Sequence, residues 1–202
     1  LVGCVIGGLG YQVSREILDS TARDLEQRIE ADLDADFLAL IRPAELAAQV
    51  LSVTSLVEEQ SLEGRLTRLP LLRELLTASP ALTSLYVGYD NGDFFMVRRL
   101  WNDDDRRFFK APEEAAFLVQ SNENAPGGKS GRFIFLDQDM ASLRSEDSPD
   151  YATGFDPRTR PWYSTVMAAA GQIKTEPYAF HTTGKVGITV ANRGINGTAV
   201  AG

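Results

Sequence analysis

The segment at positions 155–163 holds the residues whose types and spacing best suit the binding of a small molecule. It reads FDPRTRPWY, and it combines two arginines, two prolines and an aromatic pair. The prolines fix the backbone φ angle and stiffen the loop. Arg160 offers a planar fork of donors that suits a carboxylate or a phosphate, whereas Trp162 and Tyr163 offer large apolar faces with polar tips. These groups together predict a pocket for a small anionic ligand.

The same segment also fits a purely structural role. Trp162 and Tyr163 could be core residues that open a helix, and the two arginines could pair with local aspartates such as Asp156. The residue types are compatible with both interpretations. The two interpretations differ in whether Arg160 finds a partner within the protein.

Charge and composition argue against several other functions. The net charge of −8 repels nucleic acid, so no nucleic-acid partner is expected. A single cysteine, Cys4, and a single histidine, His181, give no internal disulfide and too few ligands for a Cys/His metal site. No nucleophile, base and orienting acid share a recognisable spacing. We therefore expect a non-enzymatic chain without a metal or a cofactor.

The first part of the chain has a helical pattern. Apolar residues recur at helical spacing from Val13 to about Leu62, and Pro43 is expected to kink or restart this long helix. A shorter helix is expected near Arg65 to Leu76, ended by the Ser-Pro pair at 79–80. The apolar stretch 1–11 is short for a membrane span; it fits the end of a transmembrane helix, a buried helix end or a fragment of a signal peptide.

The second part of the chain has the signals of strands. Residues 82–100 predict a β-hairpin, because two apolar runs flank the Asn-Gly turn at 91–92. The further predictions are a helical piece at 112–120, a turn-rich segment at 122–131, a strand at 132–136, a surface loop at 139–154, a helix at 161–170 and a last strand at 187–192. One long helix followed by a mixed unit predicts an α+β fold with a central antiparallel sheet.

Three motifs resemble a known family. FDPRTRPWY, the TEPY at 175–178 and the TGKVGITVAN at 183–192 are similar to the Cache family, specifically the double-Cache (dCache) sensor domains. The resemblance covers roughly residues 80–192. It implies a long N-terminal helix followed by a PAS-like unit that binds small metabolites on the outer side of the bacterial inner membrane.

The resemblance also implies a division of the chain. Residues 1–14 would be the end of a transmembrane helix, and residues 15–78 would form the long helix and a short connecting helix. Residues 79–202 would be the membrane-distal PAS-like domain, ending before its last strand and before the membrane-proximal unit.

The resemblance carries binding roles onto six positions. In the amino-acid-binding subgroup of the family, the matching positions hold the ligand, and this chain has them as Arg160, Trp162, Tyr163 and Tyr178. Two positions differ, because Phe155 replaces a tyrosine and Phe180 replaces an aspartate. A buried ammonium without an acidic partner is unfavourable, so an α-amino acid is not the expected ligand. A small carboxylate, or another anionic or neutral metabolite, fits these positions better.

These features predict an extracytoplasmic, periplasmic sensor domain of a transmembrane receptor. The expected partners are a small-molecule ligand, a second copy of the chain paired through the long helix, and a membrane reached through flanking transmembrane helices. The alternative is a dimerisation module that senses nothing and has an empty pocket. Arg160 favours a sensor, since an empty pocket would not need it.

Overall fold

The computed structural model describes residues 35–125 and 127–202. The chain divides into two compact units, residues 1–41 and 42–202, and the second unit holds the whole sheet. The expected membrane-helix end at 1–14 and the long helix before residue 35 lie outside the described residues. Within the described ranges, no helix combines the length and the apolar character that a bilayer span requires.

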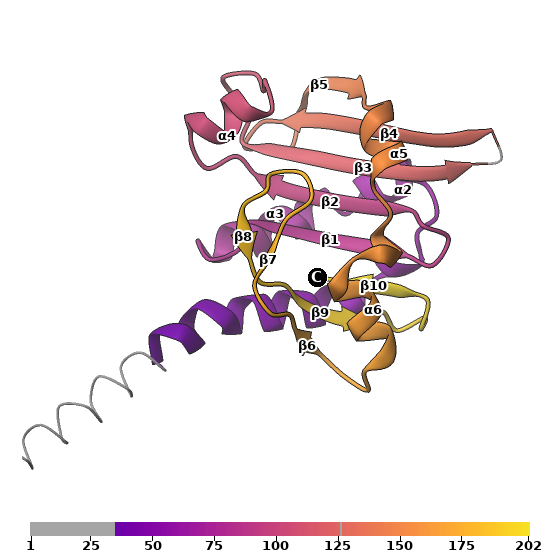
Figure 1. Cartoon of the computed structure of the whole chain (residues 1–202). Helices are drawn as coiled ribbons and strands as arrows, with labels where there is room; N and C mark the ends of the chain where they lie inside the picture. Colours follow the sequence, from indigo (N-terminus) through magenta and orange to yellow (C-terminus); the bar gives the residue numbers. More distant parts are fainter. Residues whose placement is uncertain (1–34, 126) are drawn as a thin grey trace, which may run out of the picture. The chain divides into compact units, whose positions relative to one another are not determined.

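An eight-stranded antiparallel sheet forms the centre of the second unit, with the strand order β5-β4-β3-β2-β1-β10-β9-β6 (Figure 1). Every neighbouring pair in it is antiparallel. The predicted α+β class with an antiparallel sheet is therefore confirmed. The strands of this sheet are β1 (Ser84–Tyr89), β2 (Phe94–Arg99), β3 (Phe117–Ala125), β4 (Gly128–Leu136), β5 (Ser142–Asp147), β6 (Ile173–Lys174), β9 (Val190–Arg193) and β10 (Ala199–Ala201).

The hairpin predicted at 82–100 is the pair β1–β2. Its turn is closed by the Tyr89 amide, which donates to the Asp93 carbonyl at 3.0 Å, and by the Gly92 amide, which donates to the Tyr89 carbonyl at 3.0 Å. Gly92 has a φ of 88°, a conformation that glycine adopts without steric penalty. The Asn-Gly pair thus sets the register of the two central strands.

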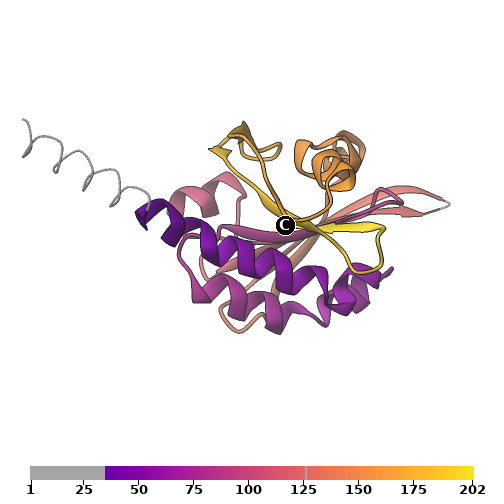
Figure 2. The same cartoon turned by 90° about the horizontal axis from the view of Figure 1, so that it is seen from below.

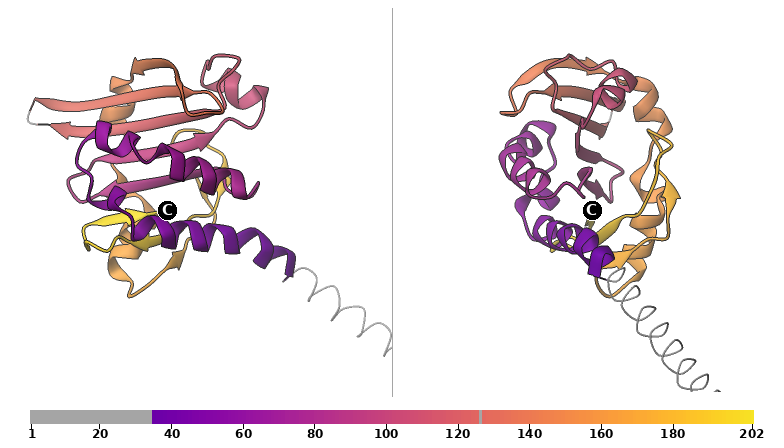
Figure 3. Two further views of the ribbon diagram at one scale, coloured as in Figure 1. Left: turned by 180° about the vertical axis from the view of Figure 1, so that it is seen from behind. Right: turned by 90° about the vertical axis from the view of Figure 1, so that its left-hand side faces the viewer.

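Helices cover one face of the sheet. They are the helical residues 42–52, α2 (Leu62–Leu66) and α3 (Leu69–Ala78), and Figures 2 and 3 show them together on this side. The side chains of Val87, Phe95 and Val97 point into this layer, where they join a core with Leu72 and Leu76. These residues are almost fully buried, so the helix face of the sheet is the main stabilising core of the unit.

The opposite face is covered by short elements from the end of the chain (Figure 2). A second, largely aromatic core lies beneath them. These elements are α5 (Pro149–Gly154), the 3₁₀ turn η2 (Pro157–Thr159), α6 (Pro161–Ala168) and the small hairpin of β7 (Tyr178–Ala179) and β8 (Val186–Gly187). The helix α4 (Asp103–Phe108) follows β2 and lies toward the edge that carries β5.

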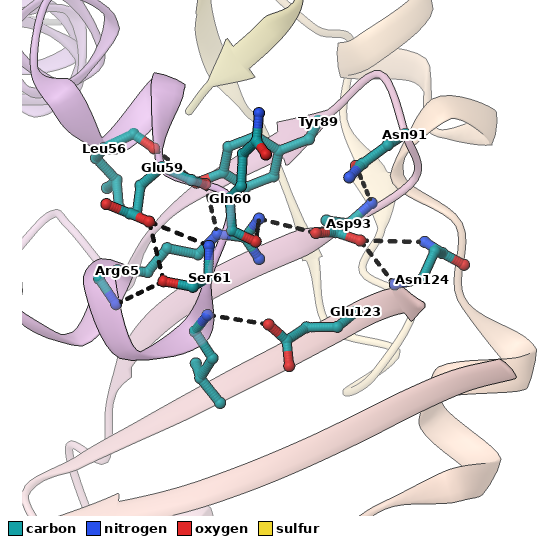
Figure 4. Close-up of polar contacts among 12 residues, drawn as sticks. Leu56, Glu59, Gln60, Ser61, Arg65, Tyr89, Asn91, Asp93, Glu123 and Asn124 are labelled. Carbon is teal, nitrogen blue, oxygen red and sulfur yellow. Dashed lines mark hydrogen bonds and ion pairs between the residues drawn. The ribbon is translucent and has the colours of Figure 1, made fainter. Parts of the chain in front are cut away.

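A buried ion pair ties the helix face to the β1–β2 turn (Figure 4). The Nη2 of Arg65 lies 2.8 Å from Asp93 Oδ2, and its Nε donates to the Glu59 carbonyl at 3.0 Å. The guanidinium also stacks on the Tyr89 ring at 4.1 Å. The second oxygen of Asp93 accepts from the Asn124 amide at 2.7 Å. Both charges are therefore compensated within the fold.

The predicted continuation of the long helix to about Leu62 is wrong. The described helix passes through Pro43 without interruption and ends at residue 52. The hydroxyls of Ser52 and Thr54 donate to backbone carbonyls three residues earlier, and such bonds compete with helical hydrogen bonding. Thr54 is then extended, and the 3₁₀ turn η1 (Ser55–Glu58) follows.

The helical piece predicted at 112–120 is also wrong, because β3 begins at Phe117. Leu118 and Val119 are both fully buried although they point to opposite faces of the sheet. A strand covered on both faces has a continuous apolar run, which periodicity does not distinguish from a buried helix.

Two other segments differ from prediction for a related reason. The turn-rich segment 122–131 is mostly paired strand in the β3–β4 hairpin, and the loop 139–154 contains β5 and α5. In β4 and β5, exposed polar side chains hide the alternation that marks a strand. The strand at 132–136 is confirmed within β4, and the helix at 161–170 is confirmed as α6.

Candidate ligand-binding site

The turn η2 and the helix α6 fix the position of Arg160. The side chain of Asp156 caps η2 by accepting from the Arg158 amide at 3.0 Å. Pro157 and Pro161 each occupy a first-turn position, where a missing N–H does no harm. Arg160 is the extended residue between the two elements, with φ −87° and ψ 146°. Two short proline-started turns therefore hold its backbone.

Trp162 anchors the segment onto the sheet. Its ring lies 4.8 Å from that of Tyr86 and 6.3 Å from that of Phe94, measured between ring centroids. Gly88 permits this approach, since a Cβ there would come within 2.7 Å of the indole. Tyr163 is also buried, and its hydroxyl contacts the Thr198 carbonyl at 3.4 Å. Both aromatic residues are thus core members as well as neighbours of Arg160.

Asp156 pairs with Arg158 and not with Arg160. The Nε and Nη2 of Arg158 lie 3.0 and 2.7 Å from the two carboxylate oxygens, a bidentate arrangement. The hydrogen bond from Arg158 lowers the pKa of Asp156 below its ordinary value. The structural interpretation in which Asp156 neutralises Arg160 is therefore wrong.

Arg160 has no charged partner of its own among the described residues. Its Nε is buried and has no hydrogen-bond acceptor in the described ranges. Its Cζ lies 5.0 Å above the ring of Phe155, which is itself buried. A buried donor of a charged group without an acceptor is unfavourable by about 1–3 kcal/mol or more, so the arrangement suits an acceptor from outside the chain.

Tyr178 enters the site from the β7–β8 hairpin. The hydroxyls of Tyr178 and Tyr86 each lie 2.8 Å from the Thr189 hydroxyl oxygen. Burial raises the pKa of both phenols, and the positive charge of Arg160 opposes the rise at Tyr178. This three-hydroxyl chain is neutral at physiological pH, so it adds no negative charge beside Arg160.

Phe180 and His181 directly follow β7 in the chain. The Phe180 ring packs edge-on against Tyr178 at 5.2 Å and rests on the backbone of Gly187, where a Cβ would come within 2.5 Å of the ring. The His181 ring lies 5.3 Å from that of Phe155. Burial, followed by the charge of Arg160, lowers the pKa of His181. The six predicted positions therefore belong to one continuous region of the sheet face.

Sequence reasoning missed three polar side chains on this face. Gln120 is fully buried in β3, and neither atom of its amide group has a hydrogen-bond partner in the part of the chain that the structure describes. Asn122 donates from Nδ2 to the Phe155 carbonyl at 3.3 Å but leaves its Oδ1 unpaired in the same ranges. Tyr151 of α5 is buried as well, and its hydroxyl lies beside Thr182, whose hydrogen bond opposes the rise in pKa that burial causes. The signal was the polar pair Gln120 and Asn122 at alternate positions of an apolar run, hidden by the helical assignment.

The register of β2, β3 and β4 places these polar side chains on the same face of the sheet as Arg160. Gln120 faces Met96 on one side and Phe133 on the other, in the pairing of β3 with β2 and β4. The Phe133 ring lies 5.2 Å from that of Tyr151, which stacks on Phe155 at 5.4 Å. Unpaired buried polar groups are rare in folded proteins. Those of Gln120, Asn122 and Arg160 lie on this face, whereas those of Arg65 and Ser121 lie on the helix side. Within the described ranges, no three His, Cys, Asp or Glu side chains are placed to hold a metal ion.

Three bacterial proteins resemble the chain in sequence, whereas no family model matches it. Adenylate cyclase 1 of Rhizobium meliloti (strain 1021) is 33% identical over 205 residues, 96% of this chain and 30% of that protein. The methyl-accepting chemotaxis protein McpB of Bacillus subtilis (strain 168) is 30% identical over 46% of this chain and 16% of its own length. McpG of Pseudomonas putida (strain KT2440), another methyl-accepting chemotaxis protein, is 45% identical over 24% of this chain and 8% of its own length. The chain thus spans at most 30% of these relatives.

Two solved structures are similar in fold to a limited degree. Both are ligand-binding domains of the Pseudomonas fluorescens chemoreceptor CtaA. The complex with L-serine aligns with 93% of this chain and 59% of that one, at a TM-score of 0.40 and 18% identity. The complex with L-isoleucine aligns with 87% and 58%, at a TM-score of 0.28 and 18% identity.

Proposed function

We propose that this chain is the ligand-sensing domain of a bacterial transmembrane receptor and that it binds a small carboxylate beside Arg160. The observation that carries the proposal is the buried Nε of Arg160, which has no acceptor among the described residues while Arg158 takes the adjacent aspartate. A carboxylate would supply the missing charge and hydrogen-bond acceptors. The rings of Trp162, Tyr178 and Phe180 would wall the rest of the ligand.

The sequence relatives support a sensory role. Their names denote different outputs, a nucleotide cyclase and two chemotaxis receptors, yet each shares only part of its length with this chain. A module common to proteins with different outputs is suited to be their input. The catalytic or signalling output of the full receptor would then lie outside these 202 residues.

A sensor explains the buried polar groups better than an inactive dimerisation module does. Each unpaired amide or hydroxyl buried on folding destabilises the native state by about 1–3 kcal/mol. A module with no ligand would gain from apolar residues at Gln120 and Asn122. Their retention in the core is expected if a polar ligand completes their hydrogen bonds.

In the full receptor the domain would lie on the periplasmic side of the membrane, anchored through flanking transmembrane helices. Two copies would pair in parallel through the long N-terminal helix. A ligand that binds one orientation of the helices better than another shifts the population toward it. A coupling free energy of about 1–3 kcal/mol is enough for a useful response.

Isothermal titration calorimetry of the 202-residue chain with short-chain mono- and dicarboxylates tests the proposal. Arg160→Ala should weaken the binding of a carboxylate roughly ten- to a hundredfold, since a charge-assisted hydrogen bond contributes about 1.5–3 kcal/mol. Arg160→Lys should restore the affinity only in part, because an ammonium does not reproduce the planar fork.

Arg158→Ala is the matched control, because Arg158 lies two residues away and is already paired with Asp156. It should leave the affinity unchanged. A folded Arg160→Ala protein that binds the carboxylate as tightly as the parent would overturn the assignment.

A further inference from the structure

A second arginine lies on the same face of the sheet as Arg160. Arg98 follows Phe94 and Met96 at alternate positions of β2, and those two residues point into the aromatic core. The Nε of Arg98 is buried and has no hydrogen-bond acceptor in the described ranges. Its Cζ lies 5.2 Å from the centre of the Phe109 ring. The face therefore holds two guanidinium groups with unpaired buried donors.

A row of aromatic rings connects the two arginines. Arg98 lies over the first ring and Arg160 over the last, and successive ring centres are 6.4, 5.2 and 5.4 Å apart. The rings belong to Phe109, Phe133, Tyr151 and Phe155. Burial raises the pKa of the Tyr151 hydroxyl, and the charge of Arg98, a hydrogen bond with Thr182 and the charge of Arg160 oppose that rise. The phenol thus lies within electrostatic reach of both cations.

The described residues supply no carboxylate to either arginine. Asp105 is the acid whose charge acts on Arg98, but its Oδ1 lies 2.6 Å from Lys185 Nζ and its Oδ2 accepts from the Trp101 amide at 3.3 Å. No ion pair within 4.0 Å joins Arg98 to an acid in this part of the chain. Neither arginine is thus ion-paired with an acid among the described residues, although Asp105 acts on Arg98 from a greater distance.

The groups between the arginines are neutral. Gln120 offers an unpaired donor and an unpaired acceptor, and Asn122 offers an unpaired acceptor, among the described residues. The two amide oxygens require a donor on the ligand, which a carboxylate does not have and a hydroxyl group does. An ammonium group would add a third positive charge where no acid of the described ranges is ion-paired with either arginine.

We propose that the site binds a dicarboxylate that carries a hydroxyl group, with one carboxylate on Arg160, the other on Arg98, and the hydroxyl between Gln120 and Asn122. This inference rests on the proposed sensor function and specifies its ligand class. Two carboxylates balance the two guanidinium charges, and one hydroxyl meets the acceptors between them.

Calorimetry on the 202-residue chain with four probes tests the inference: malate, succinate, butyrate and L-aspartate. Malate should bind at least roughly tenfold more tightly than butyrate, since it gains a second charge-assisted contact. Arg98→Gln should reduce the malate affinity to that of butyrate and leave butyrate binding unchanged. Arg160→Gln should weaken both. Arg132→Gln, at an exposed position of β4, is the control and should change neither.

A second variant isolates the hydroxyl contact. Gln120→Met keeps the length of the side chain and removes its hydrogen-bonding atoms. It should lower the malate affinity to that of succinate while leaving succinate binding unchanged. This variant also serves if Arg98→Gln does not fold.

The outcomes separate this inference from the proposed function. Arg160-dependent binding of butyrate with no gain for malate would overturn the dicarboxylate assignment and leave the proposed function standing. L-aspartate that binds as tightly as malate would overturn the hydroxyl assignment in the same way. If none of the four probes binds, the proposed carboxylate sensor itself is contradicted.

Discussion

Arg65 and Arg160 lie on opposite faces of one sheet, and they differ in the partners that the fold supplies to their guanidinium groups. Arg65 is fully buried, pairs with Asp93 at 2.8 Å and donates from Nε to the Glu59 carbonyl (Figure 4). Arg160 is partly buried, and its Nε has no acceptor among the residues that the structure describes. The fold supplies a counter-charge to Arg65, whose Nη1 also lacks an acceptor in the described ranges, but it supplies none to Arg160. The two arginines therefore differ in whether a described acid balances their charge.

This difference distinguishes a charge that stabilises the fold from a charge that is available to bind a ligand. A buried ion pair whose members are hydrogen-bonded holds elements in register, because separating its partners leaves a bare charge in the core. A buried donor without an acceptor reduces stability, and its presence suggests selection for something other than stability. The neighbouring unpaired amide of Gln120 repeats the pattern on the Arg160 face.

The largest expected effect comes from breaking the structural pair. Asp93→Ala leaves the Arg65 charge buried without its partner and should lower the free energy of unfolding by about 3–5 kcal/mol. Urea denaturation measures this change. Asp147→Ala is the matched control, because Asp147 is exposed and paired with a surface arginine, and stability should not change. If Asp93→Ala lowers the free energy of unfolding by less than about 1 kcal/mol, the Arg65–Asp93 pair does not stabilise the fold as claimed.

On the Arg160 face, by contrast, a substitution is expected to increase the stability of the ligand-free chain. Gln120→Met removes two unpaired buried polar atoms and should raise the free energy of unfolding of the ligand-free chain by about 1–3 kcal/mol. The same denaturation experiment measures it. Gln138→Met, at an exposed position, should leave stability unchanged. If Gln120→Met is destabilising, its amide is already satisfied in the native protein, and the contrast between the two faces fails.

A smaller effect is expected at His181. Burial and the charge of Arg160 lower the pKa of His181 in the ligand-free chain. An anion bound to Arg160 cancels part of that charge, so the pKa should rise on binding. Binding then takes up a fraction of a proton, and affinity should increase as the pH falls toward that pKa. Because His181 is the single histidine, an NMR titration of its ring with and without a carboxylate reports the shift without ambiguity.

Much of the fold was predictable where local chemistry is strong. The Asn-Gly turn at 91–92 predicted the β1–β2 hairpin, and the proline at 161 marked the start of α6. β3 was missed because its apolar run is buried on both faces. β10 was missed because Ala199–Ala201 is too short for a recognisable period, and its place beside β1 depends on a long-range pairing.

The candidate site was predictable in part for a similar reason. The motif identified Arg160 and its aromatic neighbours, but Asp156 lies near both Arg158 and Arg160 in sequence. Their spacing did not reveal which arginine the aspartate neutralises; the cap of η2 decides it. Arg98 and Gln120 come from strands more than 30 residues upstream, so only the register of the sheet brings them to the same face.

The most direct test follows the Arg160 Nε–H itself by NMR. On saturation with a carboxylate that binds the chain, the Arg160 Nε–H resonance should move to lower field and exchange with water more slowly, because it gains a charged acceptor. The Arg65 Nε–H, already bonded to the Glu59 carbonyl, should not change. An Arg160 resonance that stays in place while the carboxylate binds would contradict the assignment of Arg160 as the ligand anchor.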